Sequence, residues 1–229
     1  HNIQFYLSLA PVKISPLTMK MYRYSFIALC IFLISAFSNL ALSQGTQLLR
    51  EPTISESHIV FVHANDLWKV DRSGGDAIRL TSNIGGESNP HFSPDGSMIA
   101  FTGQYDGNTD VYVIPAEGGS PQRLTWHPST DEVTGWTPEG DVLFRSTRTA
   151  HPTKTNRIWH VSTDGGMPEP LAVERAARGE MSEDGKYLAY NPITFWDPEW
   201  RNYRGGQAQP IWIVNLDSYE LIQTPRTDN

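Results

Sequence analysis

The sequence predicts an all-β fold in which one unit of about four strands is repeated along the chain. Three observations support this prediction: a polar turn leading into an apolar run recurs, an apolar-aromatic pair recurs after it, and a second turn follows that pair. The glycines of the first turns, Gly96, Gly140 and Gly185, lie 44 and 45 residues apart. A period in the mid-forties is typical of a β-propeller blade, which must stack on its neighbours to bury both of its faces.

Residues 89–103, NPHFSPDGSMIAFTG, show how one unit is built. Ser93, Pro94 and Gly96 fit the first, second and fourth positions of a type I turn, because proline presets φ and glycine leaves the turn in a conformation that other residues resist. The apolar run that follows is bounded by glycines, which indicates a buried strand. Residues 110–126 add a second run, a glycine turn and a third run, so the unit reads as a small antiparallel sheet.

The other units keep the same internal order. Their first turns read SESH, SPDG, TPEG and SEDG, and their aromatic pairs are Leu67-Trp68, Val111-Tyr112, Ile158-Trp159 and Ile211-Trp212. The predicted blades cover about residues 49–82, 89–126, 134–173 and 179–225 of an incomplete propeller over residues 44–229. The last unit ends in LIQTPRTDN, which matches segments that lead into the next blade. We therefore expect four blades of a ring of about six, since closed propellers use 4–8; a β-sandwich with accidental regularity is the alternative.

The first 43 residues have a different composition. Residues 19–43 combine a basic start, an apolar core near residues 26–37 and a small-residue exit, which is the layout of a secretory signal peptide. The apolar core is shorter than the ~20 residues that a membrane anchor needs. We expect cleavage near Ser43 and an exported, periplasmic protein with no stable membrane anchor. Residues 1–18 show no usable pattern and are interpreted as an untranslated or unstructured leader, with Met19 or Met21 as the start.

Charge and cysteine content exclude several classes of function. Three of the 18 basic residues and none of the 25 acidic ones precede residue 44, so residues 44–229 carry a formal charge of −10. This balance argues against binding to nucleic acid or to an anionic membrane surface. The single cysteine, Cys30, lies in the predicted signal peptide, which leaves no disulfide or thiolate metal site in the repeats.

Several segments together resemble the N-terminal propeller of tricorn-type proteases. The resemblance runs from about Leu48 to Asn229 and includes the motifs Asp66-Leu67-Trp68, Gly135-Trp136-Thr137-Pro138 and Tyr203-Arg204-Gly205-Gly206. The Pro-Asp-Gly hairpin alone is less specific. TolB-type periplasmic propellers and the propeller caps of prolyl-oligopeptidase-like hydrolases share it, so a non-enzymatic interaction platform and such a cap are the alternatives.

The resemblance implies a large serine peptidase that degrades oligopeptides. In that family two propellers precede a PDZ-like domain and a catalytic region, the propellers filter and channel peptides, and the assembly is a homo-oligomer. The implied partners are therefore peptide substrates and downstream domains of the same protein. The family's catalytic residues lie after its propellers, so none is carried over to this chain. Founding members are cytosolic, which makes cytoplasmic location the alternative to the export that the signal peptide predicts.

The residues themselves agree with that implication, because they include no known catalytic motif. The chain has no Gly-x-Ser-x-Gly elbow, no His-Glu-x-x-His motif and no phosphate-binding Gly-x-x-x-x-Gly-Lys run. No histidine pair has zinc-ligand spacing with a third ligand nearby, although His151 and His160 flank a polar loop and could meet across a hairpin. We therefore predict no catalytic residue, no cofactor and no metal site.

Residues 191–214, NPITFWDPEWRNYRGGQAQPIWIV, are the best candidate for a binding site. They lengthen the fourth unit and bring aromatic residues together with arginines: Phe195, Trp196, Trp200, Arg201, Tyr203 and Arg204. Such sets are typical of contact sites, and arginine can pair with a peptide carboxylate. This segment has three possible roles: packing against a neighbouring blade, contact with another domain or subunit, and direct peptide contact. A second polar insertion, residues 146–157, is interpreted as a solvated hairpin tip.

Overall fold

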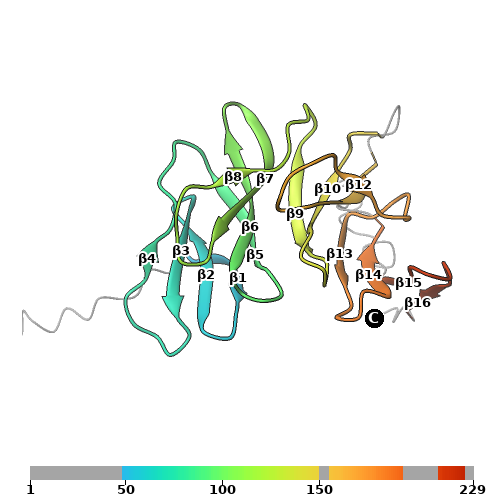
Figure 1. Cartoon of the computed structure of the whole chain (residues 1–229), viewed down its shortest axis with the longest axis horizontal. Coiled ribbons are helices and arrows are strands. Elements are labelled where there is room, and N and C mark those ends of the chain that lie inside the picture. The colour runs from blue at the N-terminus through green and yellow to red at the C-terminus, as the bar shows by residue number, and fades with distance from the viewer. Residues whose placement is uncertain (1–47, 150–154, 193–210, 225–229) are drawn as a thin grey trace, which may run out of the picture. The chain divides into compact units, whose positions relative to one another are not determined.

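The computed structural model describes residues 48–149, 155–192 and 211–224. The chain divides into two units, His1–Gln47 and Leu48–Asn229, and all described residues belong to the second. These residues form strands and turns, arranged as four sheets of four antiparallel strands each (Figure 1). The predicted all-β fold with four-stranded antiparallel sheets is therefore confirmed. The predicted leader and signal peptide lie outside the described residues.

Each sheet is a simple meander in which strands follow one another in chain order. The first sheet holds β1 (Arg50–Ile54), β2 (His58–His63), β3 (Asp66–Asp71) and β4 (Ile78–Arg79). The second holds β5 (Glu87–Phe92), β6 (Met98–Tyr105), β7 (Asn108–Pro115) and β8 (Gln122–Arg123). The third holds β9 (Asp131–Trp136), β10 (Val142–Ser146), β11 (Arg157–Val161) and β12 (Glu169–Pro170). The fourth holds β13 (Arg178–Met181), β14 (Tyr187–Asn191), β15 (Trp212–Asn215) and β16 (Leu221–Gln223).

The turn between β5 and β6 forms as its sequence predicts. The Gly96 amide donates to the Ser93 carbonyl at 2.9 Å, and Gly96 adopts a φ of 72°. Asp95 Oδ1 accepts from the Ser93 hydroxyl at 2.6 Å and from the Ser97 amide at 3.0 Å. These hydrogen bonds lower the pKa of Asp95 to about 2, because they favour its charged form. Side-chain bonds of this kind stabilise the turn through residues of the turn itself.

The apolar core lies between successive sheets. In β6, Ile99 and Phe101 pack with Val60 and Val62 of the first sheet, whereas Ala100 faces Val133 in the third. Successive side chains of a strand point to opposite faces, so an uninterrupted apolar run serves two interfaces. Between the third and fourth sheets the buried cluster contains Leu143, Ile158, Val173, Ala176, Leu188, Tyr190 and Val214.

The first strand of each sheet adjoins the first strand of the next, in the order β1, β5, β9 and β13. The last strands of the first three sheets are only two residues long. This is the arrangement of propeller blades, whose first strands face a central channel. Functional side chains that face the channel must therefore come from these four inner strands and their immediate neighbours.

Candidate binding site on the inner strands

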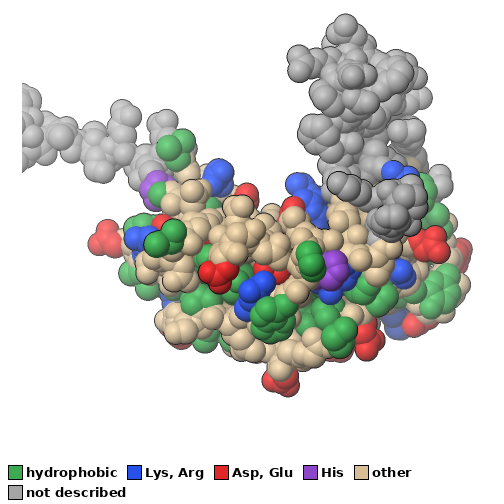
Figure 2. Space-filling model, turned by 90° about the horizontal axis from the view of Figure 1, so that it is seen from above, with side chains coloured by type: hydrophobic (Ala, Val, Ile, Leu, Met, Phe, Trp, Pro, Cys, Tyr) green, Lys and Arg blue, Asp and Glu red, His purple; other side chains and the backbone are tan. Residues whose placement is uncertain are grey.

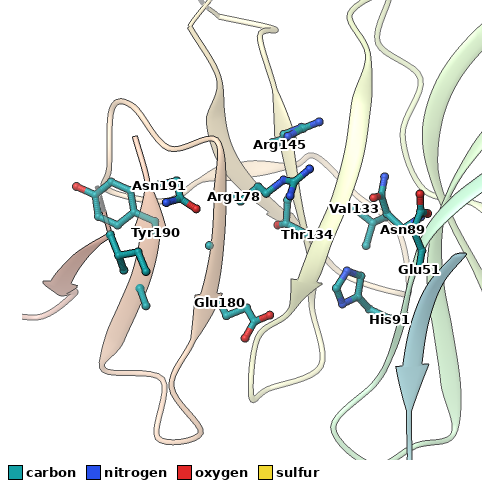
Figure 3. Close-up of a pocket in the computed structure, with 13 residues that line it drawn as sticks. Glu51, Asn89, His91, Val133, Thr134, Arg145, Arg178, Glu180, Tyr190 and Asn191 are labelled. Atoms are coloured by element: carbon teal, nitrogen blue, oxygen red, sulfur yellow. The ribbon is translucent and has the colours of Figure 1, made fainter. Parts of the chain in front are cut away.

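A cavity of about 510 Å³ lies along the inner strands of the four sheets (Figure 3). This volume is within the range of small-molecule sites. The lining residues come mainly from β1, β5, β9, β13 and β14: Glu51, Asn89, His91, Val133, Thr134, Arg145, Arg178, Gly179, Glu180, Ala189, Tyr190, Asn191 and Ile211.

β-bulges shape three of the inner strands at this cavity. In β1 the register shifts between Arg50 and Thr53, and in β5 it shifts between Ser88 and His91. In β9 an extra residue, Thr134, interrupts the pairing with β10. A bulge inserts a residue that has no partner across the ladder and re-aims the side chains around it. Side chains at or beside the bulges, those of Glu51, Asn89 and Thr134, line the cavity.

Positive φ angles mark the first two bulges. Glu51 has a φ of 51° and Asn89 a φ of 50°, and each is followed by a proline, Pro52 or Pro90. Glutamate rarely adopts this conformation, so contacts must hold it. Glu51 Oε2 accepts from the backbone amide of Asn89 at 2.6 Å, which joins the two bulges across the boundary between the first and second sheets.

The hydrogen bonds continue from the second sheet to the third. Asn89 Nδ2 donates to Thr102 Oγ1 at 3.3 Å, and the same oxygen accepts from the backbone amide of Val133 at 2.9 Å. The Trp136 indole donates to the His91 carbonyl at 2.9 Å. These groups hold neighbouring sheets in register, so their polar atoms are used in the scaffold.

Two arginines of the cavity wall have different surroundings. Arg145, on β10, forms an ion pair with Glu132 and donates from Nη1 to the Ala177 carbonyl at 3.3 Å. Arg178, at the start of β13, is exposed, and its guanidinium has no hydrogen bond or ion pair within the described residues. The hydroxyl of Thr134 is buried and likewise has no hydrogen-bond partner there. The cavity wall therefore offers one unpaired guanidinium, that of Arg178, near the ion pair of Arg145 with Glu132.

The histidine of the cavity, His91, has a lowered pKa. Burial lowers the pKa of His91 below its ordinary value, while the carboxylates of Glu180 and Glu51 act in the opposite direction. Figure 3 shows His91 and Glu180 at one end of the cavity and the arginines at the other. Across the face seen in Figure 2, basic and acidic side chains are interspersed with hydrophobic ones rather than gathered by sign. The separation of charge inside the cavity is therefore a local feature.

Buried carboxylates that pair with arginines recur in the sheets outside the cavity. Asp66 pairs with Arg79 at 2.8 Å in the first sheet, and Asp110 pairs with Arg123 at 2.6 Å in the second. Asp131, at the start of β9, pairs with Arg148 at 2.6 Å. Burial raises the pKa of Asp110, against the lowering effect of the adjacent Arg123 guanidinium. These pairs sit inside the scaffold, so we interpret them as structural.

Glu87, at the start of β5, is the corresponding acid between the first two sheets. It accepts hydrogen bonds from the hydroxyls of Thr81 and Tyr105. Burial raises the pKa of Glu87, and these hydrogen bonds oppose the rise. The pKa of the Tyr105 phenol is also raised, first by burial and then by its bond to Glu87.

Only some of the candidate residues from the sequence analysis lie among the described residues. Phe195, Trp196, Trp200, Arg201, Tyr203 and Arg204 all lie outside the described residues, and so does His151. His160 bonds through Nδ1 to Asp141 at 2.9 Å. Among the residues that the structure describes, no group of three or more potential ligands could hold a metal ion. The described part of the chain also contains no helix with the length and apolar character that a membrane crossing requires.

The cavity itself was not predicted from the sequence. Its inner-strand residues Glu51, Asn89 and Arg178 carry no motif. The available signal was proline within two of the strands, at Pro52 and Pro90, because proline inside a sheet marks an edge or a bulge.

Comparisons with known proteins agree on one relationship. A family model described as the tricorn protease N-terminal β-propeller domain matches residues 46–229. Tricorn protease homolog 1 of Streptomyces coelicolor is 32% identical over 179 residues, which cover 76% of this chain and 16% of that relative. The crystal structure of the tricorn protease superposes with a TM-score of 0.67 at 27% identity, covering 79% of this chain and 18% of that one. A putative TolB from Agrobacterium tumefaciens, at 20% identity and a TM-score of 0.61, shares the fold over 79% of this chain and 62% of its own.

Proposed function

Because this chain belongs to the family of tricorn protease N-terminal β-propeller domains, we propose that it is the substrate-gating and assembly module of a serine peptidase that degrades oligopeptides. The match over residues 46–229, which includes all four sheets, carries the proposal. The cavity on the inner strands supports it, because a gate needs a polar passage lined by a rigid scaffold.

We assign catalysis to parts of the protein outside this chain. The chain spans 16% of the length of its Streptomyces coelicolor relative. Its sequence also contains no Gly-x-Ser-x-Gly elbow and no His-Glu-x-x-His motif. In this proposal the blades belong to a closed ring of about six. The partners are peptides, the downstream domains and further copies of the same protein.

We further propose that the protein is exported to the periplasm. The basic start and short apolar core of residues 19–43 support a signal peptide that is cleaved near Ser43. N-terminal sequencing of the protein purified from a periplasmic fraction tests this assignment. A protein that is retained in the cytoplasm with residues 19–43 intact would contradict it.

The peptidase assignment is tested on the full-length protein. We expect hydrolysis of fluorogenic oligopeptides that a serine-directed fluorophosphonate abolishes. Gating is tested with Ala189→Trp, because Ala189 lines the cavity and a large side chain there narrows it. The variant should lower kcat/KM severalfold for long peptides and leave the shortest substrates unaffected. Ala172→Trp, at an exposed position that does not line this cavity, is the matched control.

The outcomes separate the candidate functions. Equal rates for Ala189→Trp and the control on all substrates would remove the gating role but leave the peptidase. A full-length protein that hydrolyses no peptide would remove the proposal as a whole. The fold shared with the TolB protein would then favour a non-enzymatic interaction platform.

A further inference from the structure

We propose that a small pocket beside the inner-strand cavity binds an organic cation, with Glu180 as the counter-charge and Phe92 and Trp136 as aromatic walls. The ligand is the ammonium or guanidinium group of a peptide, and in this respect the inference rests on the proposed function. The pocket has a volume of about 220 Å³, which suits a single side chain. Its lining residues are His91, Phe92, Pro94, Gly135, Trp136, Glu180 and Met181.

The apolar wall of the pocket comes from one position of the repeat. Phe92 ends β5, Trp136 ends β9 and Met181 ends β13, so each is the last residue of an inner strand. All three side chains are half-buried. Phe92 packs on the core between the first two sheets, Trp136 on the core between the second and third, and Met181 on the core between the third and fourth. The scaffold therefore uses one side of each of these side chains, and the other side lines the pocket.

Glu180, on β13, supplies the negative charge. It is exposed and forms no hydrogen bond or ion pair with any described residue. Glu180 and His91 line both this pocket and the larger cavity, and Figure 3 shows them at the end away from Arg145 and Arg178. Among the described residues that line the pocket there is no lysine or arginine. Burial lowers the pKa of His91, which disfavours a positive charge on that ring, so the carboxylate has no counter-charge at the pocket.

Aromatic rings beside an unpaired carboxylate favour a cation over a neutral group. The faces of tryptophan and phenylalanine attract positive charge, and a carboxylate adds charge-assisted hydrogen bonds. The Trp136 ring is held in place, because its indole nitrogen donates to the His91 carbonyl at 2.9 Å. The flexible thioether of Met181 can pack against the methylene stem of a lysine or arginine. An anion would instead be repelled by Glu180.

The neighbouring surface has the same sign of charge. A second hollow, of about 500 Å³, lies between the first turns of the first two sheets and shares Phe92 and Pro94 with the pocket. Its wall includes the carboxylates of Glu56 and Asp95, and none of the described residues that line it is basic. A surface of one sign raises the local concentration of oppositely charged ligands. The approach to the pocket therefore also favours a cation.

The cation can come from a basic side chain or from a peptide N-terminus, and three peptide amides separate these sources. N-acetyl-Ala-Lys-Ala-amide carries a side-chain ammonium, N-acetyl-Ala-norleucine-Ala-amide is its neutral analogue, and Ala-norleucine-Ala-amide carries only an N-terminal ammonium. Binding to the 229-residue chain is followed through the indole NMR signals of its tryptophans, because Trp136 lies in the site. We expect the lysine peptide to bind roughly tenfold more tightly than its neutral analogue, through one partly exposed ion pair and the cation–π contacts. A preference for either ammonium over the neutral analogue supports the site, and the preferred peptide identifies the source.

Variants connect the preference to the proposed residues. Glu180→Gln should remove the preference for the cation, because the amide keeps the size of the side chain without its charge. Phe92→Leu should reduce the preference severalfold and leave the neutral analogue nearly unaffected, because leucine keeps the apolar bulk without the aromatic face. Glu183→Gln is the matched control, since it removes an exposed carboxylate that does not line the pocket. Trp136→Phe identifies the indole signal of the site, and circular dichroism melting confirms that each variant is folded.

Equal affinities for the three peptides would overturn the inference, because they would leave only an apolar pocket. An undiminished preference in folded Glu180→Gln would also overturn it, as would an unshifted Trp136 signal or no binding at millimolar concentration. These measurements do not depend on peptide hydrolysis. The cation site can thus fail while the peptidase assignment stands, and a full-length protein without peptidase activity would leave a measured cation preference intact.

Discussion

Replacement of Thr102 by valine tests how the second and third sheets are held together. Thr102 is 3% exposed, and its hydroxyl oxygen accepts from the Val133 amide at 2.9 Å and from Asn89 Nδ2 at 3.3 Å. Valine has nearly the same shape but no acceptor. The substitution therefore leaves the amide of an inner strand without its partner while the packing is preserved. A buried donor that loses its partner costs about 1–3 kcal/mol, and we expect a loss of this size in the free energy of unfolding.

The assay combines urea unfolding with amide hydrogen exchange. Exchange at Val133 should accelerate in Thr102→Val, because this amide then depends on water for a hydrogen bond. Thr102→Ser is the matched control: it removes a buried methyl group, worth roughly 1 kcal/mol, but keeps the acceptor. Both variants should thus lose stability, and only valine should expose the Val133 amide. A valine variant within about 0.5 kcal/mol of the parent, half of the smallest expected loss, with unchanged exchange would refute the reasoning.

Two further predictions concern Glu87 and Gly103. Because burial raises the pKa of Glu87 in the folded state, its contribution to stability is full below the ordinary value of 4.5 and is lost as pH rises through the raised value. Glu87→Gln should therefore flatten the decline of the urea midpoint from acidic to neutral pH. The control Glu56→Gln, in an exposed turn, should leave this decline as it is. A decline in Glu87→Gln as steep as in the parent would contradict this account. For Gly103→Ala, a Cβ would lie 2.7 Å from Tyr112 Cδ2, so we expect a loss of ~1–3 kcal/mol in unfolding free energy. Gly86→Ala, whose Cβ would meet nothing closer than 3.8 Å, should be nearly neutral, and equal losses in the two variants would show that the close approach is unimportant.

The sheets could be predicted from the sequence because their signals are local. The Ser93–Gly96 turn closes through bonds among neighbours, with Asp95 accepting from Ser93 and Ser97. The apolar run after it has the composition of a strand buried on both faces, and Ile99 and Ala100 indeed belong to different interfaces. Each of these features is determined within a few residues of the chain.

The cavity could not be predicted in the same way because it depends on pairing between distant segments. The conformation of Glu51 is fixed by a bond to Asn89, which lies on the next sheet. Nothing in the local sequence distinguishes Arg178 from Arg175, and only the position of β13 beside β9 places the former in the cavity. The bulges left one local signal, the prolines Pro52 and Pro90, whose meaning appears only once the strands are paired.

Comparison of the four sheets also distinguishes polar groups that serve the scaffold from polar groups that could bind a ligand. In the first two sheets an aspartate before the aromatic pair is matched with an arginine thirteen residues later, as in Asp66 with Arg79 and Asp110 with Arg123. The third sheet has Arg157 at the corresponding position, and this arginine donates to the Leu171 carbonyl instead. A position that repeats with its partner is explained by the scaffold.

The boundary between the third and fourth sheets lies next to the cavity. An apolar cluster packs there, as at the other two boundaries, and Arg145 donates to the Ala177 carbonyl. Arg178 follows directly and has no partner in the described residues. Sequences violate their own structural rules mainly at functional sites. Arg178 is therefore a cavity-lining side chain that the scaffold itself does not use.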